Sequence, residues 1–250
     1  MRLTVACTFD ANGLDAFEAA REQPVDLLVL PELFDGGYRK LEATGGRPAA
    51  ETILERFATL SRQHARNVVG GTLTLEEDDG YIRNTSVVFS GGNEIGRFSK
   101  VHLYRPLGED RYFAPGMLGK PLVLECDEGS IHCGVIICYD LRFPEIVRPW
   151  FKTGLDLLVV PARWPRVRDH IWQVLLRARA IENQCFVIGV NTRDDEGGGS
   201  YAFGPSGEPL LAVRPDPQPD EPLWHQCTLD TEVIARVRER LDTRPDAVLL

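Results

Sequence analysis

Short apolar runs recur along the whole chain, and they constrain its fold more than any other feature. Seven of them lie at residues 3–7, 26–31, 68–75, 85–89, 132–138, 156–161 and 185–191. Several runs are continuous rather than alternating, which is typical of β-strands that are buried on both faces. Helices must then cover the sheets, so the pattern predicts an α/β fold.

Two longer segments have the period of amphipathic helices. Over 52–66 and over 169–183, apolar residues recur at spacings of three and four, which places them on one helix face. Gly-containing turns within 76–103 flank β-rich segments and predict a hairpin or meander, so the sheet is mixed. Weaker patterns predict a short first helix at 14–22, a strand at 222–229 and a last helix at 231–241.

The length and the connections favour one domain. A chain of 250 residues is long enough for one large core. The segment 214–222 carries four prolines and several acidic residues, which is typical of an exposed loop. Because no segment reads as a linker, we expect a single domain over residues 1–250.

The composition bears on partners and on location. A net charge of −9 disfavours nucleic acid, and no apolar stretch reaches the roughly 20 residues that a membrane span needs. The first 30 residues lack the pattern of a signal peptide. The six cysteines are dispersed and form no CxxC pair, so disulfides and a structural zinc are disfavoured and a cytoplasmic protein is expected.

Three β-segments end in residues that carry chemistry: Glu32, Lys100 and Cys138. Because binding and catalytic groups in α/β proteins lie beyond the strand ends, these three side chains are expected to share one site. A thiol needs a base to become nucleophilic, which Glu32 would supply. Lys100 would favour the thiolate and stabilise an oxyanion, and the peptide N–H of Tyr139 would be a second oxyanion donor.

Each of these residues also has a structural interpretation. A cysteine in an apolar strand is usually a small buried hydrophobic residue, Glu32 would be a loop charge and Lys100 a surface charge. A Cys-His hydrolase would instead use one of the histidines, which are His64, His102, His132, His170 and His225. Nucleotide binding finds no support, because neither GxGxxG after a strand nor GxxxxGK[ST] occurs.

Four segments, in this order along the chain, resemble a known family and favour the catalytic interpretation. The segments LLVLPELF, GRFSKVHLY, GEDRYFAPG and GVIICYDLRFPE resemble the signature segments of the nitrilase superfamily, the carbon–nitrogen hydrolases. The similarity extends through PARW and RARAIENQCFVIGVN and covers nearly the whole chain. It implies a four-layer α-β-β-α sandwich that is usually dimerised through helix faces, and a reaction without metal or organic cofactor.

The resemblance also implies a role for individual residues. Glu32 matches the general base, Lys100 the oxyanion-stabilising residue and Cys138 the nucleophile of a Glu-Lys-Cys triad. Glu109 matches a second glutamate that helps to orient the substrate and the lysine, although Asp110 is adjacent. Trp164, which follows PAR, is expected either to border the substrate pocket or to be an ordinary core residue.

Within the superfamily, the segment from PARW to GVN looks most like the amidases of the ω-amidase type, which act on terminal amides of short carboxylic acids. Arg142 or Arg163 would pair with a substrate carboxylate, because guanidinium binds carboxylate in a bidentate way. Arg142 would equally serve as an ion-pair partner of Asp140 or Glu145. The alternatives are N-carbamoyl amino acid hydrolysis, nitrile hydrolysis and a non-catalytic binding protein on the same fold.

Overall fold

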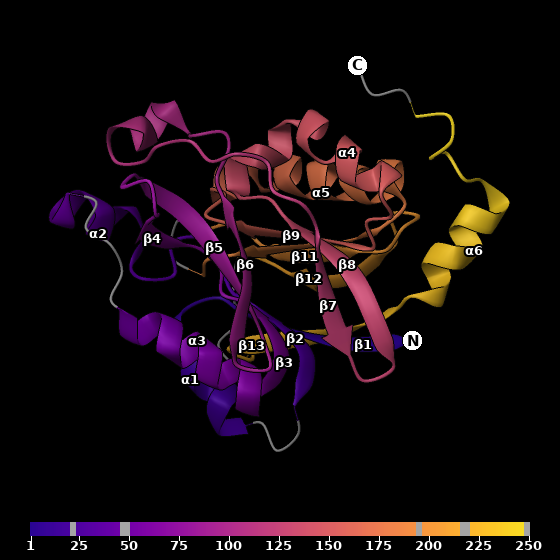
Figure 1. Ribbon diagram of the computed structural model, residues 1–250, viewed down its shortest axis with the longest axis horizontal. Coiled ribbons are helices and arrows are strands. Elements are labelled where there is room, and N and C mark those ends of the chain that lie inside the picture. The colour runs from indigo at the N-terminus through magenta and orange to yellow at the C-terminus, as the bar shows by residue number, and fades with distance from the viewer. Residues whose placement is uncertain (21–23, 46–50, 194–196, 216–220, 248–250) are drawn as a thin grey trace.

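The strands form two sheets that pack face to face (Figure 1). The computed structural model describes residues 1–20, 24–45, 51–193, 197–215 and 221–247. The first sheet has the order β13-β1-β2-β3-β5-β4, with β6 also paired to β5, and the second has the order β12-β11-β10-β9-β8-β7. The strands are β1 (Arg2–Thr8), β2 (Val25–Val29), β3 (Ala65–Val69), β4 (Leu73–Glu76), β5 (Ile82–Ser90), β6 (Asn93–Ser99), β7 (Leu122–Cys126), β8 (Gly129–Val135), β9 (Leu157–Ala162), β10 (Phe186–Asn191), β11 (Ser200–Phe203), β12 (Pro209–Val213) and β13 (Trp224–Asp230).

Helices cover the outer face of each sheet, which confirms the expected α-β-β-α sandwich (Figure 1). Helices α1 (Ala11–Ala20) and α3 (Glu51–Gln63) lie on the first sheet, and α4 (Arg148–Lys152) and α5 (Asp169–Asn183) lie on the second. The other helices are α2 (Gly37–Thr44), α6 (Glu232–Arg240) and the 3-10 turns η1 (Arg105–Leu107), η2 (Glu109–Arg111), η3 (Cys138–Arg142), η4 (Pro144–Ile146) and η5 (Arg166–Arg168).

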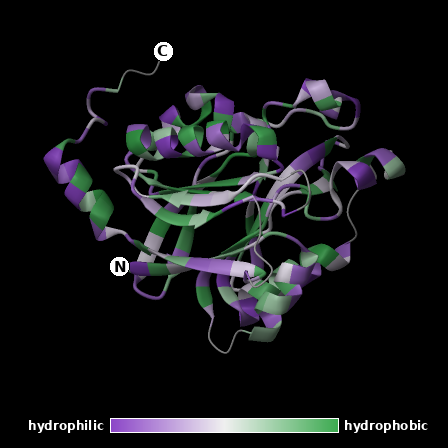
Figure 2. Ribbon diagram, turned by 180° about the vertical axis from the view of Figure 1, so that it is seen from behind, coloured by the Kyte–Doolittle hydropathy of each residue, from purple (hydrophilic) through white to green (hydrophobic). Residues whose placement is uncertain are grey.

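The continuous apolar runs follow from this layering, because a central strand contacts a core on each face. Val5 of β1 packs in the core between the two sheets, whereas its neighbour Ala6 packs in the core beneath α1 and α3. Leu27 and Leu28 of β2 divide in the same way. Figure 2 shows the corresponding pattern on the outer helices, which carry hydrophobic and hydrophilic residues in turn.

The sheets are mixed, as predicted. β1, β2 and β3 are parallel neighbours, and β9 is parallel to both β8 and β10, while the segment from β3 to β6 is antiparallel. The turns that link β4 to β5 and β5 to β6 contain Gly80 and the pair Gly91 and Gly92, each with a positive φ. The parallel strands bring the carboxyl ends of β2, β8 and β9 to one end of the sandwich.

Two predicted strands end differently from the expectation. The run 68–75 is interrupted after Val69, because Gly71 has φ +62° and its Cα lies against the carbonyl oxygen of Pro31, where a Cβ would clash. The run 132–138 leaves the sheet at Val135, and Cys138 begins the η3 turn. Both departures bring loops together at the same end of the sandwich.

The remaining predictions agree with the structure within a few residues. The two long helices are α3 and α5, and the C-terminal strand and helix are β13 and α6. Part of the predicted first helix (21–22) and most of the proline-rich loop (216–220) lie outside the described residues. All six cysteines are buried and free. Within the described ranges, no helix has both the length and the apolar composition of a membrane span.

Candidate active site

Three residues from separate segments of the chain meet below the surface of one cavity. Lys100 directly follows β6, and its Nζ lies 2.8 Å from Glu32 Oε1 and 2.7 Å from Glu109 Oε1. All three side chains have an exposed fraction of 0%. The structure therefore places the predicted Glu32, Lys100 and Glu109 in one buried cluster.

The Glu32 carboxylate is held in place by further donors. Asn84 Nδ2 donates to Glu32 Oε1 at 2.9 Å, and the backbone N–H of Arg163 donates to Oε2 at 3.0 Å. The loop after β2 is fixed by Thr72, whose hydroxyl accepts from Leu33 N–H at 2.8 Å. Glu32 is thus an anchored carboxylate, and its rotamer is determined by both sheets.

Glu109 rather than Asp110 enters the site. The hydroxyl of Tyr38 donates to Glu109 Oε1, and the backbone N–H of Tyr104 donates to Oε2 at 2.5 Å. Asp110, the neighbour in the η2 turn, is exposed. Donors from Tyr38 and Tyr104 therefore hold the Glu109 carboxyl group in place.

The cluster keeps Lys100 charged. Burial alone would lower the pKa of the Lys100 ammonium, but Glu32, Tyr38 and Glu109 together raise it well above its ordinary value. An ammonium has three N–H donors, and the two carboxylates take two of them. One donor remains for a ligand.

Cys138 lies at the first position of the η3 turn, in a backbone conformation that is rare for its residue type. Its φ is +46°, in the left-handed region, and such strain is common where a side chain must be aimed at a ligand. Burial and the nearby Glu32 raise the pKa of the thiol well above its ordinary value, against Lys100 and the Arg163 N–H, which lower it. The resting group is therefore a neutral thiol beside a carboxylate.

Asp140 ties the Cys138 turn to the segment that follows Lys100. Its carboxylate accepts from the backbone N–H of Ile137 at 3.1 Å and from that of His102 at 2.7 Å. It also accepts from the Val101 N–H at 3.3 Å. One buried carboxylate thus links the two backbones that carry the thiol and the ammonium.

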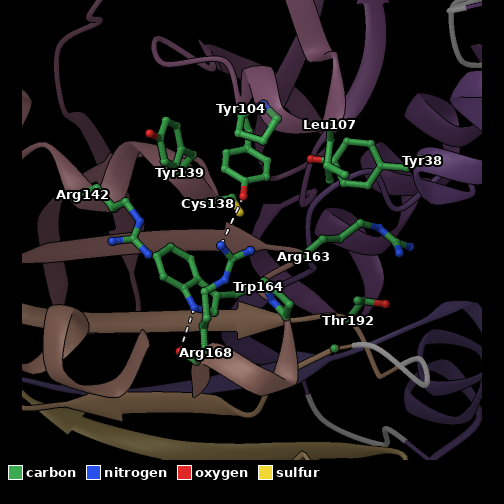
Figure 3. A pocket seen from close by; sticks show the side chains of 13 residues that line it. Tyr38, Tyr104, Leu107, Cys138, Tyr139, Arg142, Arg163, Trp164, Arg168 and Thr192 are labelled. Carbon is green, nitrogen blue, oxygen red and sulfur yellow. Dashed lines mark hydrogen bonds between the residues drawn. The ribbon is translucent and has the colours of Figure 1, made fainter. Parts of the chain in front are cut away.

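Cys138 opens into a cavity of about 410 Å³ (Figure 3). The described residues that line it are Tyr38, Tyr104, Pro106, Leu107, Cys138, Tyr139, Arg142, Arg163, Trp164, Pro165, Arg168, Thr192 and Gly197. Figure 3 shows the sulfur near the centre of the site, with the tyrosine side chains on one side of it and Trp164 and Arg168 on the other. A volume of this size accommodates a small-molecule ligand.

Tyr139 and Trp164 both border the cavity. The Tyr139 N–H has no hydrogen-bond acceptor among the described residues, so it is available to a ligand. The Trp164 N–H donates to Asn191 Oδ1 at 2.9 Å, and its indole stacks on Trp172 with ring centroids 5.2 Å apart. Trp164 is consequently both a core residue and a wall of the cavity, and its ring rather than its amide faces a ligand.

The two predicted carboxylate-binding arginines have different surroundings. Arg163 Nε donates to the Glu32 carbonyl oxygen at 3.1 Å, and its guanidinium lies against Gly37, away from the centre of the cavity. Arg142 forms no ion pair with Asp140 or Glu145, and its Cζ lies 5.0 Å from the centroid of the Trp164 ring. Of these two arginines, Arg142 is therefore the one whose guanidinium is available to a carboxylate.

Four functional candidates were not predicted: Tyr38, Asn84, Tyr104 and Arg168. Each lies in or against the site through tertiary contacts, and none stands at the end of an apolar run. None of the described residues that line the cavity is a histidine, and His102 instead bonds to Asp140 at 2.8 Å. The described residues contain no group of three or more His, Cys, Asp or Glu side chains that could hold a metal ion.

Comparison with known proteins decides the family. Residues 11–235, nearly the whole chain, match the family model of the carbon–nitrogen hydrolases. The chain belongs to this family. An omega-amidase of Yersinia enterocolitica is 34% identical over 222 residues, which cover 87% of this chain and 82% of that protein. The hydrolase therefore has a close relative in the omega-amidase branch, to which its sequence was expected to be similar.

Solved structures agree with the assignment to carbon–nitrogen hydrolases. A Saccharomyces cerevisiae member of the nitrilase superfamily aligns with a TM-score of 0.79 and 25% identity, over 96% of this chain and 94% of that one. An amidase mutant from Nesterenkonia sp. AN1 aligns with a TM-score of 0.75 and 26% identity, over 96% of each chain. That amidase carries the acetamide moiety of fluoroacetamide on its active-site cysteine. The resemblance to the nitrilase superfamily is thus confirmed.

Proposed function

We propose that this carbon–nitrogen hydrolase is an amidase that cleaves the terminal amide of a short linear carboxylic acid to the acid and ammonia. The observation that carries the proposal is the buried cluster of Glu32, Lys100 and Glu109 beneath a cavity that contains Cys138. It is supported by the omega-amidase among the relatives and by the cysteine adduct in the related amidase.

In the first half of the reaction, Cys138 is the nucleophile and Glu32 the general base. Because burial holds the thiol neutral, Glu32 takes the S–H proton as sulfur attacks the amide carbon. The C–N bond of the tetrahedral intermediate then breaks. Glu32 gives its proton to the leaving nitrogen, so ammonia departs and a thioester remains on Cys138.

In the second half, Glu32 activates water. It accepts a proton as the water oxygen attacks the thioester carbon, the C–S bond breaks, and the proton returns to sulfur. The acid product leaves, and both side chains recover their starting states. Tyr38, through its bond to Glu109, keeps the second carboxylate pointed at Lys100 during both halves.

Lys100 and Tyr139 stabilise the oxyanion of both tetrahedral intermediates. The third N–H of the Lys100 ammonium is directed by the two carboxylates that hold the other two. The free backbone N–H of Tyr139 lies next to the nucleophile along the chain. Donors that are fixed before the reaction give the largest electrostatic stabilisation.

Arg142 pairs with the carboxylate at the other end of the substrate. Its guanidinium lines the cavity and forms no ion pair with the described residues. It stacks over the ring of Trp164. A bidentate guanidinium–carboxylate pair would orient the substrate so that its amide reaches Cys138. Hydrolysis of N-carbamoyl amino acids or nitriles would use the same residues, and a substrate panel separates these reactions.

We also propose a homodimer that acts in the cytoplasm on a small-molecule amide. The resemblance to a family that dimerises through helix faces supports the dimer, and the six free, buried cysteines support a reducing compartment. The net charge of −9 argues against nucleic acid as a partner.

The test is ammonia release by the purified protein from short ω-amides, N-carbamoyl amino acids and nitriles, with Cys138→Ala beside it. We expect ω-amides to give the highest kcat/KM and Cys138→Ala to lose essentially all turnover while it keeps its circular dichroism spectrum. Cys227→Ala, which changes a buried cysteine outside the cavity, is the matched control. Undiminished turnover by Cys138→Ala would overturn the assignment of the nucleophile.

A further inference from the structure

The described lining of the cavity is basic in an acidic protein. The chain has a net charge of −9, yet the charged side chains among the described residues that line the cavity are all arginines: Arg142, Arg163 and Arg168. Arg163 is engaged with the backbone of Glu32. Arg142 and Arg168 form no ion pair with any described residue, so the cavity holds two guanidinium charges that the described residues do not neutralise.

Arg168 is half-buried and is held by neutral groups. Its Nη1 donates to the hydroxyl of Tyr104 at 3.2 Å, and its Cζ lies 5.7 Å from the centroid of the same ring. Its Nε is buried and has no hydrogen-bond partner among the residues that the structure describes. A guanidinium that has lost part of its solvation carries a free-energy cost. A tyrosine ring and hydroxyl offset only part of that cost, and an anionic ligand with charge-assisted hydrogen bonds would offset more of it.

Trp164 sets the spacing of Arg142 and Arg168. Arg142 stacks over the Trp164 ring, and Trp164 Nε1 donates to the carbonyl oxygen of Arg168 at 3.0 Å. In Figure 3 the indole lies between the two guanidinium groups, and the Arg168 guanidinium extends toward Tyr104 on the Cys138 side of the cavity. Arg142 and Arg168 are therefore both positioned by contacts with the same indole.

We propose that Arg168 binds a second acidic group, so that the preferred substrate of this hydrolase is a terminal amide with two carboxylates. Arg142 pairs with one carboxylate and Arg168 with the other, while the amide lies at Cys138. This inference rests on the proposed amidase function and narrows its substrate class. The cavity volume of about 410 Å³ leaves room for a branched acid of this kind.

The test uses three amides that share a terminal carboxamide and differ in charge: butyramide, glutaramate and 3-carboxyglutaramate, with zero, one and two carboxylates. The wild-type protein should have its highest kcat/KM with 3-carboxyglutaramate. In Arg168→Gln, the ratio of kcat/KM for 3-carboxyglutaramate to that for glutaramate should fall by about 10- to 100-fold, as expected when a charged hydrogen-bond partner is lost.

Arg166→Gln is the matched control, since Arg166 lies in the same η5 turn but donates to the Pro215 carbonyl oxygen and does not line the cavity. It should keep the wild-type ratio. Arg168→Lys should recover part of the ratio, because a lysine keeps the charge and loses the bidentate geometry. A ratio that is unchanged in Arg168→Gln, or a wild-type preference for glutaramate, would overturn the inference.

A binding measurement separates this inference from the proposed function. Calorimetry on Cys138→Ala, which cannot form the thioester, should give about 10- to 100-fold weaker binding of 3-carboxyglutaramate when Arg168→Gln is added. Should the wild-type protein hydrolyse none of the three amides, the amidase proposal fails, and the binding ratio still decides whether Arg168 is an anion site. Equal affinity with and without Arg168 would reject that site.

Discussion

At the scale of single residues, Lys100 is the centre of the site. A cation buried between two carboxylates is stabilised by both, and in the proposed mechanism its third N–H donates to the substrate oxygen that develops charge. Lys100→Met should lower kcat/KM for an ω-amide by about two to three orders of magnitude, the range seen for loss of such a donor. Steady-state ammonia release at several substrate concentrations measures the loss.

One control variant and one folding check accompany this prediction. Lys120→Met removes an exposed lysine and should keep the wild-type rate. Because Lys100→Met leaves two buried carboxylates without a cation, its folding must be verified by thermal unfolding. A folded Lys100→Met variant that turns over within threefold of wild type would contradict the oxyanion role.

The residues that sequence alone could identify are those with a local signal. Glu32, Lys100 and Cys138 stand where apolar segments end, and the ordered motifs added Glu109. Tyr38 and Arg168 had no such signal, because their relevance depends on which segments the two sheets bring together. A tyrosine at the start of α2 and an arginine at the end of η5 become part of a site only through tertiary contacts.

At the scale of elements, the η3 turn shows how backbone geometry aims the thiol. Asp140 accepts three backbone N–H bonds, two of which come from the residues after Lys100. Asp140→Asn would turn an amide N–H₂ toward some of these donors. We expect the unfolding free energy to fall by about 2–3 kcal/mol and kcat to fall more than KM rises. Urea denaturation and steady-state kinetics on the same preparation measure both.

Asp110→Asn serves as the comparison, because Asp110 is an exposed carboxylate in the neighbouring η2 turn. It should change neither stability nor kcat. The alkylation rate of Cys138 by iodoacetamide gives a readout that general destabilisation would not lower, and it should fall in Asp140→Asn. A variant that alkylates at the wild-type rate would show that Asp140 supports the fold and does not position the thiol.

The η3 turn also marks where sequence-based prediction of elements fails. The residues from Ile136 to Cys138 are as apolar as the strand before them, so the pattern extends the strand. Strand β8 nevertheless ends at Val135, and the Ile136 N–H makes the last backbone hydrogen bond to β9. Hydrophobicity reports burial, and both a strand and a buried turn satisfy it. For the same reason the apolar pattern of 68–75 did not predict the break between β3 and β4. That break depends on the close approach of Gly71 to Pro31.

At the scale of the whole molecule, the apolar runs predicted sheets covered by helices, and the resemblance supplied the number of layers. The order of the strands could not be obtained from patterning, because pairing β13 with β1 joins the two ends of the described chain. Such long-range pairing depends on the packing of complete layers. Those layers also enclose all six cysteines as free thiols.

The buried thiols should make the fold sensitive to alkali. Burial raises the pKa of Cys133 and Cys185 far above its ordinary value and raises that of Cys126 and Cys227 to about 11. In the unfolded chain the same thiols ionise near pH 8.5. Because the pKa values are higher in the folded state, their stabilising contribution is complete below about pH 8.5 and is lost progressively as the pH rises toward the folded values.

Cys185→Ala isolates one of these contributions. Each such thiol lowers the unfolding free energy by about 1.4 kcal/mol per pH unit once the unfolded form is ionised. Urea unfolding under reducing conditions between pH 7 and pH 10.5 should therefore show a shallower decline above pH 9.5 in the variant, by about that slope. At pH 7 the two proteins should differ only by the constant cost of the lost sulfur. Parallel curves across the whole range would mean that Cys185 ionises as easily in the folded state as in the unfolded chain, and that the sandwich does not keep this thiol from solvent.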